Sequence, residues 1–207
     1  MLARDHLVTT MERLESLYGT PSGPAIAKEI DHINSSYRKL IEAAPFVTIA
    51  TSGPEGLDCS PKGDPAGFVR VLDEKTLAIP DRPGNNRLDG MRNLLRDPRI
   101  ALLFLVPGVG ETLRVNGRAD ISVDPQLMES CAVNGRLPRA LIIVHVERVY
   151  FHCSKAIVRS RLWDEATKIE RTNLPSTGTL IAETSGGKLG GVDYDREAPA
   201  RIKAQLY

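Results

Sequence analysis

Residues 78–99 have the sequence AIPDRPGNNRLDGMRNLLRDPR, which joins an apolar run to a turn and then to a helix. Apolar residues recur at helical spacing after the turn, and they predict a helix over residues 86–96 that begins with a capping box of Asn86 and Asp89. The beginning of a helix exposes unpaired N–H groups and the positive end of its dipole, so it attracts anions. Arg82 and Arg87 flank this beginning, and a guanidinium group matches two phosphate oxygens well. The stretch therefore predicts a phosphate pocket; alternatively, its glycine and asparagines serve only the sharp turn between strand and helix.

The segments on both sides of this turn have the pattern of short β-strands. Apolar and β-branched residues predict strands over residues 46–51, 67–72, 76–79, 100–106, 111–116, 118–123 and 141–152, with a hairpin turn at residues 52–56. A second helix is predicted over residues 125–133. Many short strands with turns between them are typical of a barrel or a sandwich.

The two ends of the chain differ from this central part. Helical periodicity predicts helices over residues 2–18 and 24–43, whereas the residues after Trp163 are polar and glycine-rich and predict a loosely structured segment. We therefore expect three parts: an N-terminal helical arm (1–44), a barrel domain (45–163), and a C-terminal extension (164–207) that packs on or near the barrel.

Composition restricts the classes of function. The 207 residues suit one domain with extensions, and a net charge of +1 argues against a nucleic-acid-binding or membrane-surface protein. The longest apolar run, residues 100–106, is too short to span a bilayer. Three scattered cysteines and no signal-like segment predict reduced thiols and a cytoplasmic protein.

Two other segments could face the same anion as the turn. Ser60 and Lys62 lie in CSPKGD. This segment either contacts the anion or is only an irregular strand edge, because Pro61 cannot donate to a strand ladder. Strand alternation places Thr112 and Arg114 on one face, which either lines a polar groove or simply faces solvent.

A late segment, HCSKAIVR, also carries candidate residues. Lys155 and Arg159 are four residues apart on a helix that Ser154 could cap, so their charges stack and favour an anionic partner. Neighbouring His152 and Cys153 point to opposite faces of a strand, as do His145 and His152. We therefore expect neither a metal site nor a nucleophilic Cys–His pair.

Taken together, the strings FVTIAT, SPKGD, GFVRVL, LAIPDRPGNNR, DPRIALLFLVPG, ETLRVNGRA and HCSKAIVRSRLW resemble the pyridoxamine 5′-phosphate oxidase-like, FMN-binding split-barrel family. The resemblance covers about residues 46–163 and is greatest for a subgroup of probable FMN-dependent enzymes. It implies a mainly β, α+β fold: a six-stranded antiparallel Greek-key split barrel with peripheral helices. It also implies a homodimer with FMN at the interface, bound by residues from both chains.

The resemblance further implies a set of FMN-binding residues. Ser60, Lys62, Arg82, Asn86 and Arg87 would hold the phosphate, Pro80 and Asp81 would approach the flavin ring, Thr112 and Arg114 would lie across the groove, and Lys155 and Arg159 would come from the late segment.

The function expected from this resemblance is that of an FMN-dependent oxidoreductase acting on a small-molecule redox substrate. His152 and Arg114 are the candidates for an acid or base near the groove. The residues after Trp163, DEATKIE, lack the R-x-H ending of the pyridoxamine phosphate oxidases proper, so vitamin B6 oxidation is not predicted. The alternatives are a non-catalytic flavin-binding or sensing module, and a split barrel that uses deazaflavin or haem.

Overall fold

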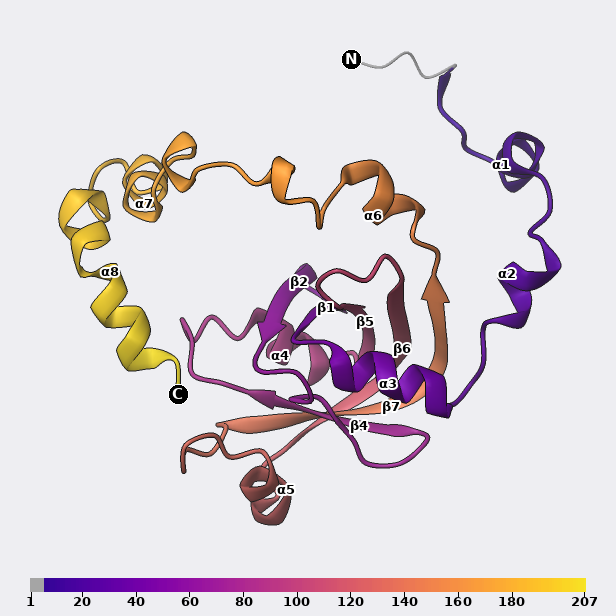
Figure 1. Cartoon of the computed structure of the whole chain (residues 1–207), viewed down its shortest axis with the longest axis horizontal. Helices are drawn as coiled ribbons and strands as arrows, with labels where there is room; N and C mark the ends of the chain where they lie inside the picture. Colours follow the sequence, from indigo (N-terminus) through magenta and orange to yellow (C-terminus); the bar gives the residue numbers. More distant parts are fainter. Residues whose placement is uncertain (1–5) are drawn as a thin grey trace.

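A seven-stranded antiparallel sheet is the centre of the computed structural model, which describes residues 6–207 (Figure 1). The strand order is β2-β1-β5-β6-β7-β4-β3. The strands are β1 (Phe46–Gly53), β2 (Gly56–Gly63), β3 (Arg70–Val71), β4 (Thr76–Asp81), β5 (Arg99–Leu105), β6 (Thr112–Ser122) and β7 (Ala140–His152). The architecture is α+β and is consistent with a split barrel, but the sheet has seven strands rather than the predicted six and it does not close.

Alternating side chains build the core on one face of the curved sheet. In β5, Ile100, Leu102 and Phe104 are buried while the residues between them are partly exposed. The helix α3 (Ser35–Ala43) adds Tyr37 and Ile41 to the same core, so the last helix of the predicted N-terminal arm packs directly on the barrel. Burial of this many apolar side chains is the main force that holds the sheet curved.

Two predicted strands are in fact one. Residues 111–116 and 118–123 were expected to be separate, but β6 runs continuously from Thr112 to Ser122 with a bulge between Asn116 and Gly117. A Cβ atom at Gly117 would lie 2.0 Å from the backbone oxygen of His145 in β7. The glycine therefore allows two strands to approach closely and does not mark a turn.

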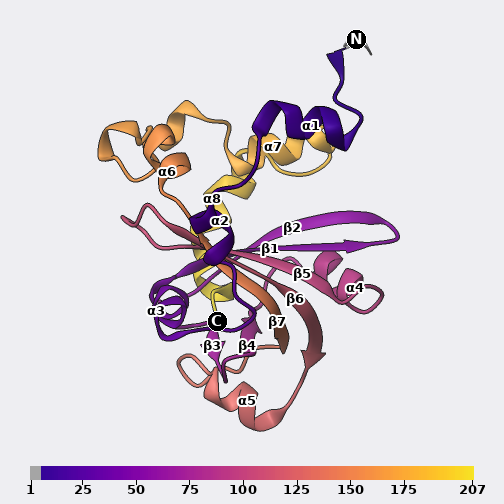
Figure 2. The same ribbon diagram turned by 90° about the vertical axis from the view of Figure 1, so that its right-hand side faces the viewer.

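The edge strand β2 approaches the end of β4 that extends past its pairing with the short edge strand β3, and β2 and β4 do not pair. Side chains bridge them instead: Lys62 Nζ lies 2.5 Å from Asp81 Oδ1, and Arg82 Nε lies 2.7 Å from Asp64 Oδ2. Pro61 in β2 pairs with Thr48 of β1 at the sheet edge, where its missing N–H costs no ladder bond. Figure 2 shows the β1–β2 hairpin projecting beyond the rest of the sheet.

The helices surround the sheet and form two arms (Figure 1). Besides α3, they are α1 (Met11–Tyr18), α2 (Gly23–Ala27), α4 (Asp89–Leu94), α5 (Pro125–Ser130), α6 (Lys155–Ser160), α7 (Thr177–Thr184) and α8 (Gly191–Gln205), with short 3-10 turns at Glu165–Thr167 and Arg171–Asn173. The C-terminal segment is thus more helical than predicted. No helix among residues 6–207 has both the length and the apolar character needed to cross a membrane.

Several predicted helix bounds were wrong for identifiable reasons. The single helix expected over residues 24–43 is interrupted because the backbone of Ile30 pairs with that of Val149 in β7, and Asn34 then caps α3. The helix expected at residues 2–18 is described only as α1, and residues 1–5 lie outside the described part. The helix expected over residues 125–133 is the shorter α5, which ends at Ser130.

Candidate functional site

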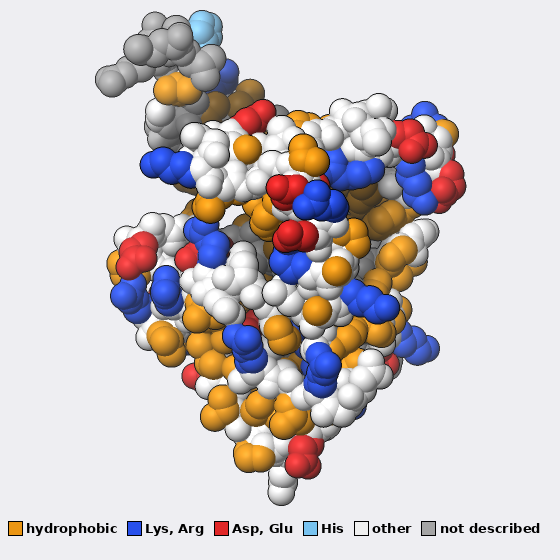
Figure 3. Space-filling view, turned by 90° about the vertical axis from the view of Figure 1, so that its left-hand side faces the viewer, with side chains coloured by type: hydrophobic (Ala, Val, Ile, Leu, Met, Phe, Trp, Pro, Cys, Tyr) orange, Lys and Arg blue, Asp and Glu red, His pale blue; other side chains and the backbone are white. Residues whose placement is uncertain are grey.

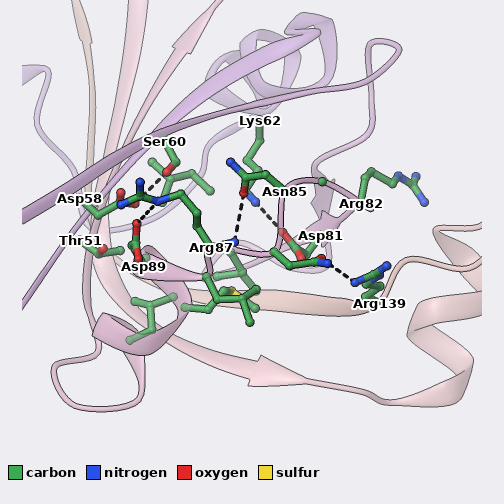
Figure 4. Close-up of a pocket in the computed structure, with 18 residues that line it drawn as sticks. Thr51, Asp58, Ser60, Lys62, Asp81, Arg82, Asn85, Arg87, Asp89 and Arg139 are labelled. Atoms are coloured by element: carbon green, nitrogen blue, oxygen red, sulfur yellow. Dashed lines mark hydrogen bonds and ion pairs between the residues drawn. The ribbon is translucent and has the colours of Figure 1, made fainter. Parts of the chain in front are cut away.

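A pocket of about 300 Å³ lies where the sheet fails to close (Figure 4). Its walls come from β1 and β2, from the loop of residues 82–88, from the beginning of α4, and from the beginning of β7. This volume is at the lower end of the range for small-molecule sites.

Charged side chains of both signs line the pocket. Its four cations and three carboxylates are Lys62, Arg82, Arg87, Arg139, Asp58, Asp81 and Asp89. The carboxylates are already engaged: Asp81 pairs with Lys62, Asp89 accepts from Arg87 Nε at 2.7 Å, and Asp58 accepts from the Ser60 hydroxyl at 2.8 Å. Arg82 is paired with Asp64, so Arg139 is the lining cation without a carboxylate partner among the described residues, and its charge favours an anionic ligand.

The loop before α4 is fixed by its own asparagines. Asn86 and Leu88 adopt left-handed backbone conformations with φ of 58° and 62°, so α4 begins at Asp89 and the predicted capping box at Asn86 does not form. Asn85 Oδ1 accepts from the backbone N–H of Arg87 at 3.1 Å, and Asn86 Oδ1 accepts from Arg139 Nη1 at 2.7 Å. This arrangement leaves the Arg87 side chain 76% exposed at the pocket mouth.

The inner part of the pocket is apolar and rigid. Ile49, Leu94 and Ile142 are almost fully buried and line it from three different elements. Behind them, the buried amide of Asn93 in α4 donates to the Thr51 hydroxyl at 3.2 Å. This contact joins α4, which supplies part of the apolar wall, to β1.

A second cavity of about 360 Å³ adjoins the first. Lys62, Asp64, Phe68, Pro80 and Arg82 are among its lining residues, and Arg82 belongs to both cavities. The Arg82 guanidinium points away from the Lys62–Asp81 pair in Figure 4. Its Nη1 atom is buried and has no hydrogen-bond partner among residues 6–207.

The structure brings most of the predicted site residues together. Six of them line the first pocket, namely Ser60, Lys62, Asp81, Arg82, Asn86 and Arg87. Pro80 lines the second cavity. The other four, Thr112, Arg114, Lys155 and Arg159, line neither cavity within one chain. The binding role of all eleven stays a prediction.

Arg114 belongs instead to an aromatic cluster on the outer face of the sheet. Its guanidinium lies 5.4 Å from the centre of the Tyr150 ring, and its Nη1 donates to the Tyr150 hydroxyl at 2.9 Å. The ring of His152 packs beside Tyr150, with 5.4 Å between ring centres. Burial, followed by the charges of Arg114 and Lys28, lowers the pKa of His152, so this histidine is neutral at pH 7.

Sequence reasoning missed several lining residues, and Arg139 is the clearest case. It precedes β7 in an ordinary turn, and it reaches the pocket only because Ala140 pairs with Asp81 across β4 and β7. Asp58 was missed for a similar reason, since its carboxylate matters only once β2 folds back toward α4. Neither residue carries a local signal in the sequence.

Comparisons with known proteins agree with this geometry at the level of the family. The family model for pyridoxamine 5′-phosphate oxidase matches residues 33–153. A comparison with curated protein sequences found no match.

Among solved structures, the chain is similar to three proteins of bacterial origin. HupZ of Group A Streptococcus has 22% identity and a TM-score of 0.46, over 56% of this chain and 91% of that one. General stress protein 26 of Bacillus anthracis has 13% identity and a TM-score of 0.43, over 55% and 88% of the two chains. An FMN-binding protein of Syntrophomonas wolfei has 11% identity and a TM-score of 0.41, over 55% and 86%.

Proposed function

This chain belongs to the pyridoxamine 5′-phosphate oxidase family, and from that premise we propose that it is an FMN-dependent oxidoreductase acting on a small-molecule substrate. The observation that carries the proposal is the pocket mouth. There, Lys62, Arg87 and Arg139 come from β2, the 82–88 loop and the start of β7 to surround one asparagine-rich turn. A phosphate dianion is the ligand that such a group of cations and amides fits best.

The rest of the pocket also fits FMN. Ile49, Leu94 and Ile142 give a flat apolar ring a dry wall, while Ser60 and the Asp81 carboxylate offer polar contacts.

Bound FMN would supply the electron or hydride transfer. The chain's own residues would do the binding and the positioning. Arg87 and Lys62 would contact the phosphate at the mouth, and Asp81 would keep the Lys62 ammonium group oriented. The buried wall would exclude water from one side of the ring.

We also propose a homodimer in which each FMN is held by both chains. The proposal follows from the family resemblance, which implies that Arg114, Lys155 and Arg159 contact FMN: these residues do not line the pocket of their own chain, so a second copy would have to supply them. The sheet face that carries Arg114 also exposes Phe46, at 38%, at the end of β1.

The first test is whether the purified protein takes up FMN. We expect a yellow protein, or a colourless one that quenches the fluorescence of added FMN at a stoichiometry of one per chain. Reduction of the bound flavin by NADH, NADPH or a metabolite from a panel would then establish oxidoreductase activity. A purified protein that contains no FMN and does not bind added FMN would refute the proposal.

The non-catalytic alternative has one observation in its favour. Each pocket carboxylate is already engaged by a neighbouring cation or hydroxyl, so the pocket offers no unengaged acid or base among the described residues. FMN that binds tightly but that no donor or metabolite reduces would favour this flavin-binding module.

A mixing experiment tests the shared site. Arg87→Ala and Arg114→Ala chains would each form weakened sites alone. If each site takes Arg87 from one chain and Arg114 from the other, a mixed dimer has one site with both substitutions and one with neither. Half of the sites in the mixed dimer should then bind FMN normally. No recovery on mixing, in a sample that contains mixed dimers, would contradict the shared site.

A further inference from the structure

The C-terminal segment returns to the barrel at Tyr207. The Tyr207 hydroxyl donates to Asp64 Oδ1 at 2.6 Å, and the Arg82 guanidinium lies 5.7 Å from the centre of the Tyr207 ring. Arg136 donates to the backbone oxygen of the same residue. The bond to Asp64 raises the pKa of Tyr207, so the hydroxyl keeps its proton and stays a donor at pH 7.

Tyr207 is the point at which residues 164–207 are attached to the barrel. The other hydrogen bonds and ion pairs of this segment, among the residues that the structure describes, join partners within residues 161–207. Helix α8 buries no side chain, and Ile202 and Leu206 are exposed on it. Figure 3 shows hydrophobic side chains exposed among lysines and arginines on this side, with a hollow between the upper and lower parts of the face. The specific contacts that attach the segment are therefore those of Tyr207.

Helices α7 and α8 form one unit. A Cβ atom at Gly178 in α7 would lie 2.2 Å from the backbone oxygen of Gly191 in α8, so the two helices meet backbone to backbone. The Asp195 carboxylate accepts from the Gly178 N–H at 2.7 Å and from the Ser176 hydroxyl at 2.5 Å. The two helices therefore move together, and the segment can bend at residues 164–176, whose regular structure is two short 3-10 turns.

Tyr207 contacts both members of an ion pair that crosses the gap between β2 and β4. Asp64 follows the last residue of β2, Arg82 follows the last residue of β4, and Arg82 Nε donates to Asp64 Oδ2 at 2.7 Å. The Asp64 side chain is only 2% exposed, so its bonds to Arg82 and Tyr207 are charge-assisted and largely withdrawn from water. Arg82 also lines the first pocket, so the pair that Tyr207 reinforces belongs to the pocket wall.

We propose that residues 177–207 form a strap that holds the β2–β4 gap closed through Tyr207, and that release of the strap opens the first pocket on this side. Release breaks the contacts of one side chain and one backbone oxygen, and it disturbs neither a strand ladder nor the core, so the open form is accessible from the native state. The inference goes beyond the proposed function and rests on it only for the identity of the ligand that passes the gap.

The first test is native-state hydrogen exchange of the intact protein, read by mass spectrometry. A helix of this length that buries no side chain is marginally stable in water, so the amides of α8 are protected mainly while the strap is attached. We expect Tyr207→Ala to speed exchange in α8 by about 10- to 100-fold, as for a lost charged hydrogen bond. Tyr207→Phe, which keeps the ring and loses the bond to Asp64, should lie between this variant and the original protein.

Matched substitutions show whether the effect belongs to this contact. Tyr194→Phe removes a hydroxyl from the same helix, one that forms no hydrogen bond among the described residues, and should leave exchange in α8 unchanged. Asp64→Asn changes only the barrel and should still speed exchange in α8, whereas Asp58→Asn, whose carboxylate bonds to Ser60, should not. Unchanged exchange in β6 would show that each variant keeps its fold.

The second test measures passage through the gap, by stopped-flow quenching of FMN fluorescence. Tyr207 lines neither cavity, so Tyr207→Ala should raise the association and dissociation rate constants of FMN by the same factor, several-fold, and change the dissociation constant little.

Two results would overturn the strap. One is exchange in α8 that is the same in Tyr207→Ala and the original protein, and the other is faster exchange in Tyr194→Phe to the same extent. Faster exchange in α8 with unchanged FMN rate constants would overturn its control of the gap. A protein that does not bind FMN would refute the proposed function, while the exchange experiment would still decide whether the strap exists.

Discussion

Replacement of Arg87 by alanine is the most direct test of the pocket mouth. Arg87 is exposed, it extends from a loop held by Asn85, and no core residue depends on it. The variant should therefore fold normally, and any change in FMN affinity would report on the phosphate contact alone.

The expected size of the effect follows from what Arg87 already does. A hydrogen bond between charged groups is worth about 1.5–3 kcal/mol. Before FMN binds, Arg87 pairs with Asp89, and an exposed ion pair of this kind is worth about 0.2–1 kcal/mol, which FMN must replace. The net loss on mutation is then about 0.5–2.8 kcal/mol, or about 2- to 100-fold in the dissociation constant.

Quenching of FMN fluorescence measures this constant directly. Arg92→Ala is the matched control, because Arg92 lies in α4, has the same charge and is within 4.0 Å of Asp89, yet it does not line the pocket. If Arg87→Ala and Arg92→Ala weaken FMN binding equally, the effect comes from the loss of positive charge near the pocket and not from a specific phosphate contact. If Arg87→Ala leaves the constant unchanged, the turn is only structural.

Three other predictions concern stability. Gly117→Ala should lower the free energy of unfolding by about 1–3 kcal/mol, since the new Cβ meets backbone atoms of β7. Gly23→Ala is the control: a Cβ there has no atom within 4 Å, so this variant should not destabilise the protein. Urea unfolding measures both variants. Leu113→Ala should lower the free energy of unfolding by about 2–5 kcal/mol because this side chain is 1% exposed. Leu57 is 89% exposed, so Leu57→Ala should change the midpoint of urea unfolding little. The pKa of His152 is lowered on folding, so the unfolded chain binds the proton more readily, and stability should fall as the pH drops below about 6.5 and through the folded value. His152→Gln should flatten that part of a plot of melting temperature against pH, and an unchanged slope would contradict the assignment.

The residues that could be predicted from the sequence are those whose surroundings are local. Alternation in β5 follows from residues two apart, and the turn at residues 82–87 follows from its own glycine and asparagines. For this reason Asn86 and Arg87 were placed in the pocket from the turn itself, whereas Lys62 was placed there only by the resemblance to the family. The bounds of the helix behind the turn were not predicted.

The residues that could not be predicted depend on contacts distant in the chain. Arg139 enters the pocket through the pairing of β7 with β4, and Ile30 leaves its predicted helix because Val149 offers it a backbone partner. Gly117 was interpreted as a break because a glycine between two strands looks like a turn. Glycine is required at this position because the backbone of His145 in β7 leaves no room for a Cβ atom, and no local sequence pattern reveals that contact.

The gap between β2 and β4 has a consequence for local opening of the native structure. Elsewhere in the sheet, separating two strands breaks a cooperative ladder of backbone bonds, but here the hydrogen bonds among the described residues are between side chains, such as Lys62–Asp81 and Arg82–Asp64. Widening this gap should therefore cost far less than global unfolding. The ladder amides of β2 bond to β1 and not across the gap, so native-state hydrogen exchange should show them still protected when the gap widens. A ligand could then enter through a gap whose motion leaves the folded core undisturbed.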